Sequence, residues 1–219
     1  MATLNVLSPD SPVLIKIDHI QLEGILGWPD VPRGIVLFAN GSGNSRSSPC
    51  NAYLAHMLQK LGFATLLFDL LTEEETQRRN NVFEIPLLAE RLEGAREWLE
   101  QENKTASLPH GYFGVGTGGA AALQAAAIFP KHVKAVVSRG GRPDLAKPHL
   151  SQVAAPTLLI VGGKDDVVLK LNREAYVRLT CHKDLLVVPG ASQNFEEPGA
   201  MEEVAQWAGR WFSHYLVPD

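Results

Sequence analysis

A glycine-rich stretch in the middle of the chain contains the residues whose types and spacing best suit a site of chemistry. Residues 112–119 read Tyr-Phe-Gly-Val-Gly-Thr-Gly-Gly, and a run of small residues follows. This order predicts a buried strand, a sharp turn and a helix. Gly114, Gly116 and Gly119 fit the G-x-G-x-x-G spacing of a dinucleotide-binding turn. With Gly118 as its last glycine, the stretch also fits the G-x-S-x-G frame of a nucleophile elbow, in which Gly116 replaces the serine.

The position of this turn in the chain helps to separate the two interpretations. A dinucleotide fold carries its glycines after the first strand of a βαβ unit, whereas this turn lies mid-chain. The next predicted strand ends in Arg139, which could hold a 2′-phosphate, so a binding module for a phosphate-bearing cofactor at the Gly114–Gly119 turn remains an alternative. Glycine-rich strand ends at 40–44 and 162–163 instead favour a hydrolase site built from several loops.

The two cysteines form no recognisable metal or disulfide pattern. Cys50 and Cys181 are far apart in sequence, which predicts two reduced thiols, no metal site and no cofactor. Cys50 follows the loop at 40–49, and His56 lies further along the same predicted helix as a conceivable base. A small residue in the first turn of a helix needs no catalytic role, and this interpretation of Cys50 is preferred.

Composition excludes several classes of function. The chain has 219 residues, a net charge of −4 and 45% hydrophobic residues, without the basic footprint of a nucleic-acid-binding protein. No run of apolar residues is long enough to span a bilayer, and the N-terminus lacks the pattern of a signal peptide. We therefore expect a cytoplasmic protein that binds small molecules or proteins, with neither nucleic acid nor membrane as a partner. A homodimer is compatible with this composition.

Alternating strand and helix patterns predict an α/β fold. The pattern favours a three-layer sandwich with a mainly parallel sheet and an N-terminal antiparallel hairpin, in a single domain over 1–219. The polar segment 72–81 is expected to be a solvated loop, with a lid over the substrate as the alternative. Strands are expected at 13–17, 20–26, 34–39, 64–70, 112–115, 134–139, 156–163 and 185–190, and helices at 51–61, 85–102, 172–180 and 201–215 as well as after the turn.

Several blocks, in the right order, resemble the α/β-hydrolase superfamily and within it the dienelactone-hydrolase-like branch. The resemblance covers nearly the full length, from about Leu14 to Tyr215. It implies an α/β-hydrolase fold whose reaction is hydrolysis of small esters or lactones through an acyl-enzyme. The blocks are Phe-Ala-Asn-Gly-Ser-Gly at 38–43, Thr-Leu-Leu-Phe-Asp-Leu-Leu-Thr at 65–72, Leu-Leu-Ala-Glu-Arg-Leu at 87–92, the turn itself, Ser-Arg-Gly-Gly-Arg-Pro-Asp-Leu-Ala at 138–146, Ala-Pro-Thr-Leu-Leu-Ile-Val-Gly-Gly at 155–163 and Val-Pro-Gly-Ala-Ser-Gln at 188–193.

The resemblance also implies where a catalytic triad would lie. Asp165 matches the position of the triad acid, with Asp166 as the fallback. Gly116 stands at the nucleophile position, where the family has serine or cysteine, and Gln193 stands where the family has its histidine base. A third departure is Asn40, because this loop usually begins with histidine.

These departures disable the family mechanism at two positions. Glycine has no atom that attacks a carbonyl, and glutamine does not exchange a proton near neutral pH. The resemblance leaves an oxyanion hole of backbone N–H groups near Ser42 and at Thr117, in a pocket with Asn40 and Cys50 that would take a small ester or lactone.

Three explanations of the substitutions stay open at this point. The chain is a natural pseudoenzyme that retains its pocket for binding, or an engineered scaffold. An engineered hydrolase whose nucleophile has moved to Cys50 is a further alternative.

Overall fold

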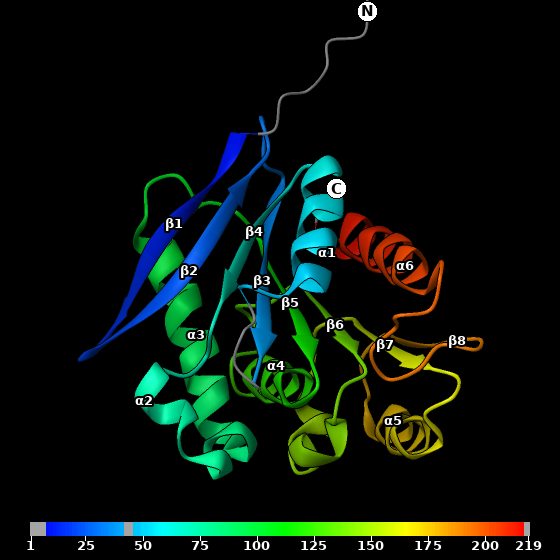
Figure 1. Cartoon of the computed structure of the whole chain (residues 1–219). Helices are drawn as coiled ribbons and strands as arrows, with labels where there is room; N and C mark the ends of the chain where they lie inside the picture. Colours follow the sequence, from blue (N-terminus) through cyan, green and yellow to red (C-terminus); the bar gives the residue numbers. More distant parts are fainter. Residues whose placement is uncertain (1–7, 42–45, 217–219) are drawn as a thin grey trace, which may run out of the picture.

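An eight-stranded β-sheet forms the centre of the protein (Figure 1). The structure, a computed structural model, describes residues 8–41 and 46–216. The strands lie side by side in the order β1-β2-β4-β3-β5-β6-β7-β8, so β3 and β5 are central. Their bounds are β1 Ser8–Ile17, β2 Ile20–Trp28, β3 Gly34–Asn40, β4 Phe63–Phe68, β5 His110–Val115, β6 Ala135–Arg139, β7 Thr157–Gly162 and β8 Lys183–Val188.

The predicted N-terminal hairpin is confirmed. β1 pairs with β2 in antiparallel register, from Ile17 opposite Ile20 outward. Asp18 in the tight turn between them has a φ of 49°, a left-handed conformation that aspartate tolerates. β2 is antiparallel to β4, and the remaining neighbours are parallel.

Helices cover both faces of the sheet, which confirms the predicted three-layer α/β fold (Figure 1). Buried residues of α1 and α6 pack on one face, and those of α3 and α4 pack on the other. Half of α4 is buried alanine, because a helix sandwiched between the sheet and α3 has no polar face. The helices are α1 Pro49–Lys60, α2 Glu73–Thr76, α3 Ile85–Gln101, α4 Thr117–Ile128, α5 Asp166–Arg178 and α6 Ala200–Tyr215, with 3-10 turns at Arg79–Phe83, Pro143–Ala146 and Leu150–Gln152. None of the helices in the described residues is long and apolar enough to cross a membrane.

The prediction of a loop over 72–81 is wrong in part. The segment forms the short helix α2 and begins a 3-10 turn. Thr72 accepts a hydrogen bond from the backbone N–H of Glu75, whose carboxylate accepts one from the N–H of Thr72. Threonine followed three residues later by glutamate is a capping box, a signal that the high charge of the segment obscures.

Helix α5 begins earlier than the periodicity predicts. The expected start was residue 172, whereas the helix starts at Asp166. The Asp165 carboxylate accepts a hydrogen bond from the N–H of Val168 at 3.0 Å and so caps the helix. An acidic residue that resembles a catalytic acid therefore also serves as a helix start.

His110, the first residue of β5, predicts a dependence of stability on pH. Its side chain is buried, and its Nε2 has no hydrogen-bond partner among the described residues. Burial lowers the pKa of His110 from 6.5 to about 4, and the charge of Arg96 acts in the same direction. The unfolded chain thus binds more protons than the native one between these two values.

Native stability should consequently fall as the pH falls from about 6.5 to about 4. The loss from this group alone is expected to be about 2 to 3 kcal/mol. Urea unfolding across this range should show a shallower pH dependence for His110→Gln than for the native chain. Equal slopes for the two proteins would contradict the assignment of the titration to His110.

Candidate functional site

The turn after β5 has the backbone geometry of a nucleophile elbow. Gly116 has φ 57° and ψ −123°, a conformation between the strand and α4 that glycine adopts readily and that strains a residue with a side chain. A Cβ atom at position 118 would lie 2.0 Å from the carbonyl oxygen of Ala39, and one at 114 would lie 2.5 Å from the Cα of Gly119. A Cβ at Gly116 would meet no atom within 4 Å. Close packing thus requires the flanking glycines, whereas position 116 has room for a side chain.

The register of the central strands brings two further side chains to this turn. Asn40 at the end of β3 pairs with Val115, and Val115 pairs on its other side with Arg139 at the end of β6. Because parallel strands end at the same edge of the sheet, Asn40 and Arg139 flank the elbow. This arrangement places a polar and a cationic residue on opposite sides of Gly116.

The loop after β8 carries Gln193 to the same edge. A Cβ at Gly140 would lie 3.3 Å from the carbonyl oxygen of Gln193, so this loop passes close to the end of β6. Ser192 donates hydrogen bonds from its N–H and its hydroxyl to Glu197, at 2.9 and 3.2 Å. These bonds lower the pKa of Glu197 and fix the turn. Ser192 therefore has the turn role that its position predicts.

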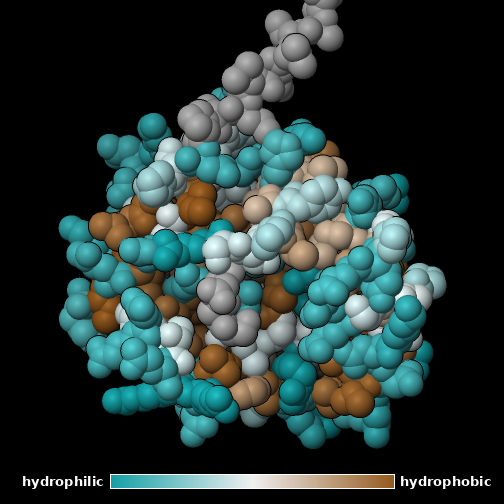
Figure 2. Space-filling model, viewed as in Figure 1, coloured by the Kyte–Doolittle hydropathy of each residue, from teal (hydrophilic) through white to brown (hydrophobic). Residues whose placement is uncertain are grey.

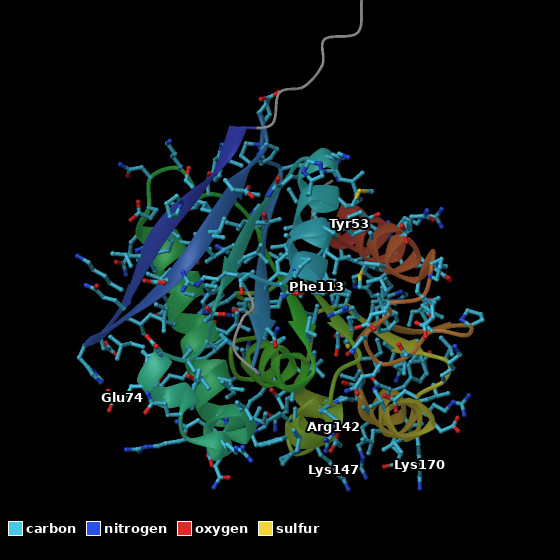
Figure 3. The ribbon with its side chains drawn as sticks, viewed as in Figure 1. Tyr53, Glu74, Phe113, Arg142, Lys147 and Lys170 are labelled. Carbon is cyan, nitrogen blue, oxygen red and sulfur yellow. The ribbon has the colours of Figure 1, made fainter. Side chains whose placement is uncertain are left out.

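The elbow, the ends of β3 and β6 and the loop after β8 line one cavity, with a volume of about 500 Å³. Four of the predicted site residues, Asn40, Gly116, Thr117 and Gln193, line it. In Figure 3, Arg142 of the same cavity lies at the lower edge of the molecule, beyond the end of β5 that carries Phe113. The full lining is Asn40, Val82, Phe83, Val115, Gly116, Thr117, Arg139, Gly140, Arg142, Val167, Val168, Leu171, Gln193 and Asn194.

The predicted acid lies beside the cavity and not on its wall. Asp165 is not among the lining residues, although Val167 and Val168 of the helix it caps are. No hydrogen bond joins Asp165 to Gln193 in the described part of the chain. The fallback, Asp166, is exposed at the first position of α5. The carboxylate at 165 is thus engaged in capping.

The predicted oxyanion hole is described only in part. Thr117 is the first residue of α4, where backbone N–H groups have no partner within the helix. A Cβ at Gly41 would lie 2.1 Å from Thr117 Oγ1, so the loop after β3 packs directly on the elbow. Ser42 lies outside the described residues.

Cys50 does not line the cavity. It occupies the first turn of α1, is partly buried, and interacts electrostatically with Arg139. His56 is exposed on the same helix, six residues further on, a spacing that puts the two side chains on different faces. The pairing of a Cys50 thiol with His56 as base therefore has no support in the geometry.

The apolar wall of the cavity was not predicted. Val82 and Phe83 precede α3, and Val167 and Leu171 belong to α5. Phe83 is 57% exposed and Val167 is 71% exposed, although both are apolar. Figure 2 shows hydrophobic side chains gathered at the lower edge of the molecule, where α5 lies in Figure 1. Short apolar runs between charged or polar residues, at 82–83 and 167–169, were the sequence signal of this wall.

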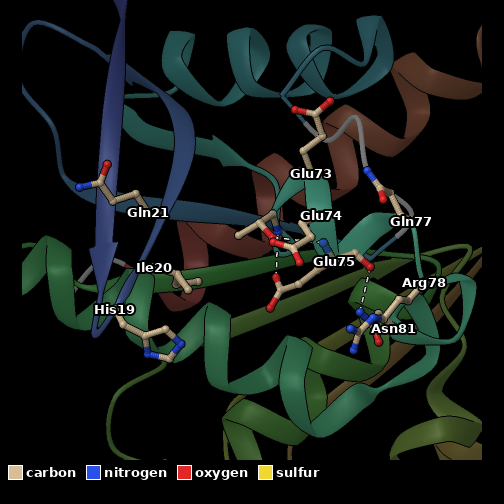
Figure 4. Close-up of a pocket in the computed structure, with 10 residues that line it drawn as sticks. His19, Ile20, Gln21, Glu73, Glu74, Glu75, Gln77, Arg78 and Asn81 are labelled. Carbon is tan, nitrogen blue, oxygen red and sulfur yellow. Dashed lines mark hydrogen bonds between the residues drawn. The ribbon is translucent and has the colours of Figure 1, made fainter.

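A second cavity of about 720 Å³ lies apart from this site, between the β1–β2 turn and α2 (Figure 4). It includes Glu73, Glu74 and Glu75, and none of the predicted site residues line it. Glu75 is already used in the capping box and in an ion pair with Arg91 at 3.1 Å. These carboxylates act as helix-start residues, for which negative charge is favourable.

Comparisons with known proteins agree with the fold. A dienelactone hydrolase from Anabaena variabilis is 53% identical, covers 95% of this chain with 98% of its own, and superposes with a TM-score of 0.92. The esterase Est1E from Butyrivibrio proteoclasticus is 13% identical with a TM-score of 0.79, covering 93% of this chain and 98% of its own, and shows the fold alone.

A curated relative from Mycobacterium tuberculosis carries a different name, "Putative phosphoribosyl transferase". It is 55% identical over 94% of this chain, but the chain spans only 47% of that protein. The sequence model of the dienelactone hydrolase family matches residues 22–200. With this match and the eight-stranded sheet order, the chain belongs to the dienelactone hydrolase family of α/β-hydrolase-fold proteins.

Proposed function

We propose that this chain is a disarmed member of its family that binds a small ester or lactone without hydrolysing it through an acyl-enzyme. The observation that carries the proposal is the elbow at Gly116, which keeps a positive φ and open space for a side chain although none is present. Glycine adopts this conformation without strain, whereas it would cost a residue with a side chain about 1 to 3 kcal/mol, so the turn keeps the shape that an attacking residue would occupy. The cavity is therefore retained while its attacking atom is absent.

The side chains around the elbow support the same proposal. Gln193 takes the place of a base on the cavity wall, and an amide does not accept a proton near neutral pH. Asp165 caps α5 and is bonded to no histidine within residues 8–41 and 46–216. Backbone N–H groups at the start of α4 remain available to polarise a carbonyl oxygen. A carbonyl compound would thus be held and oriented, but not attacked.

Three alternatives receive less support. A dinucleotide module at the Gly114–Gly119 turn would need the turn after the first strand of a βαβ unit, whereas this turn follows β5 of an α/β-hydrolase sheet. The phosphoribosyl transferase named in the relative is proposed to depend on the part of that protein that this chain does not match. Thiol catalysis at Cys50 lacks both a base and a place on the cavity wall.

Two measurements on the native chain test the proposal. We expect no covalent labelling by a fluorophosphonate, and hydrolysis of an activated aryl ester no more than about 10³-fold faster than in water. A small lactone should nevertheless raise the melting temperature, because a ligand that binds only the folded state stabilises it. Stoichiometric acylation would overturn the proposal, and its persistence in Cys50→Ala would exclude the thiol as its source.

A further inference from the structure

Arg139 is a buried cation that has no acidic partner in the described part of the chain. The residue is 7% exposed, and its Nε has no hydrogen-bond partner among the described residues. Its described neighbours include a thioether and an aromatic ring: Nη1 lies 3.8 Å from the sulfur of Met201, and the guanidinium lies 5.6 Å from the centre of the Phe195 ring. Neither contact supplies a negative charge.

The other arginines in comparable positions are neutralised. Arg91 and Arg96 are buried on α3, and each forms an ion pair with a glutamate. Arg142, on the same cavity as Arg139, forms two hydrogen bonds of 2.8 Å to Asp144. Arg139 is thus the exception among these cations, and it belongs to the wall that faces the elbow.

An unpaired buried charge is costly to keep. Burial lowers the pKa of Arg139, and only the interaction with Cys50 acts in the opposite direction. Removal of a charged group from water costs several kcal/mol unless a counter-charge and hydrogen bonds compensate. An anionic ligand in the cavity would supply both the counter-charge and the hydrogen-bond acceptors. A guanidinium binds two oxygens of a carboxylate or phosphoryl group through two parallel N–H···O bonds.

The rest of the cavity indicates where the charged group and the apolar part of such a ligand would lie. The N-terminus of α4, with the N–H of Thr117, opens at the elbow and favours negative charge, and the missing side chain at Gly116 leaves space there. The cavity is also lined by Phe83 and Val167, which would contact an apolar body. We infer that Arg139 and the start of α4 form a subsite for the carboxylate or phosphoryl group of a ligand whose apolar part lies against Phe83 and Val167.

Because this subsite rests on the proposed function of the cavity as a ligand site, its test uses binding and not hydrolysis. Calorimetry and melting temperature would be measured with phenylacetate, phenyl phosphate, inorganic phosphate and neutral phenylacetamide. The two aromatic anions should bind more tightly than the amide. Arg139→Gln should weaken anion binding about 10- to 100-fold. The stronger of the two anions identifies the head group as a carboxylate or a phosphoryl group.

The unliganded variants separate a ligand-binding role from a structural one. Arg139→Gln removes an unpaired charge, so its melting temperature should be equal to or above that of the native chain. Arg142→Gln, the matched control, breaks an existing pair and should change anion affinity less than Arg139→Gln does. Arg139→Lys keeps the charge without the two parallel bonds and should retain part of the affinity.

Two outcomes would overturn the subsite. In the first, the amide binds as tightly as the anions and Arg139→Gln leaves every affinity unchanged, so the cavity is a ligand site but not an anionic one. In the second, Arg139→Gln lowers the melting temperature and leaves anion affinity unchanged, which assigns the residue to structure. Binding of none of the four compounds would count against the subsite and against the proposed function together.

Discussion

Hydrolysis of an activated aryl ester is expected to rise by at least about 10³-fold when Gly116→Ser and Gln193→His are combined. A nucleophile and its base act as a unit, so each change alone should give almost no activity. Both positions line the same cavity, and the strand order places them at the sheet edge where the elbow lies. Steady-state rates and acylation by a fluorophosphonate would measure the gain.

The elbow geometry makes this gain physically reasonable. A Cβ at position 116 meets no atom within 4 Å, so a serine enters without a clash. Its φ of 57° is unfavourable for a side chain and should cost about 1 to 3 kcal/mol of stability. Asp165 would have to orient the new histidine, while one of its oxygens caps α5. Because Asp165 would serve both as helix cap and as the acid that orients the histidine, we expect a reduced rate but not a loss of activity.

Two controls identify the source of any gain. Gly116→Ala with Gln193→His keeps the base and the Cβ but supplies no nucleophile, so its activity should stay at the level of the native chain. Asp165→Asn added to the active pair should lower the rate if the acid orients the base. Activity in the alanine control, or none in the serine and histidine pair, would refute the geometric assignment of positions 116 and 193.

Much of the fold could be predicted because local patterns and packing agree. The apolar run of β3 and the alanines of α4 are buried throughout, and runs of this kind admit few other structures. The errors arose where side chains bond to the backbone. Thr72 and Asp165 each cap the start of a helix. In the sequence alone, a polar residue before a charged segment is compatible both with a helix start and with a loop.

The sequence predicts which residues converge at the site, but it does not predict which charged side chain lacks a partner there. Asn40, Gly116 and Gln193 follow strands whose ends must meet at one edge, so their convergence follows from the topology. The isolation of Arg139 does not, because the carboxylate that neutralises an arginine can come from any part of the chain that the fold brings beside it. Arg142, three residues later, has such a partner in Asp144.

The second large effect expected from the structure is on stability and concerns Glu93. This buried carboxylate on α3 accepts a hydrogen bond from Arg96 Nε at 2.7 Å and one from the Tyr112 hydroxyl at 3.0 Å, and lies 2.7 Å from His132 Nδ1. Although burial acts to lower the pKa of Arg96, the hydrogen bonds that its guanidinium donates to Glu100 and Glu93 raise it. Burial first, and then Glu93, raise the pKa of Tyr112 well above its ordinary value.

Glu93→Ala should therefore lower the free energy of unfolding by about 3 to 5 kcal/mol, because it leaves the Arg96 guanidinium, which is 2% exposed, without its buried partner. The matched control is Glu97→Ala, since Glu97 pairs with the same arginine at 3.8 Å but is 57% exposed. Its cost should stay below about 1 kcal/mol. Urea unfolding at pH 7 would measure both. Equal costs for the two variants would mean that Glu100 alone neutralises Arg96, and that the buried cluster adds no stability beyond a surface ion pair.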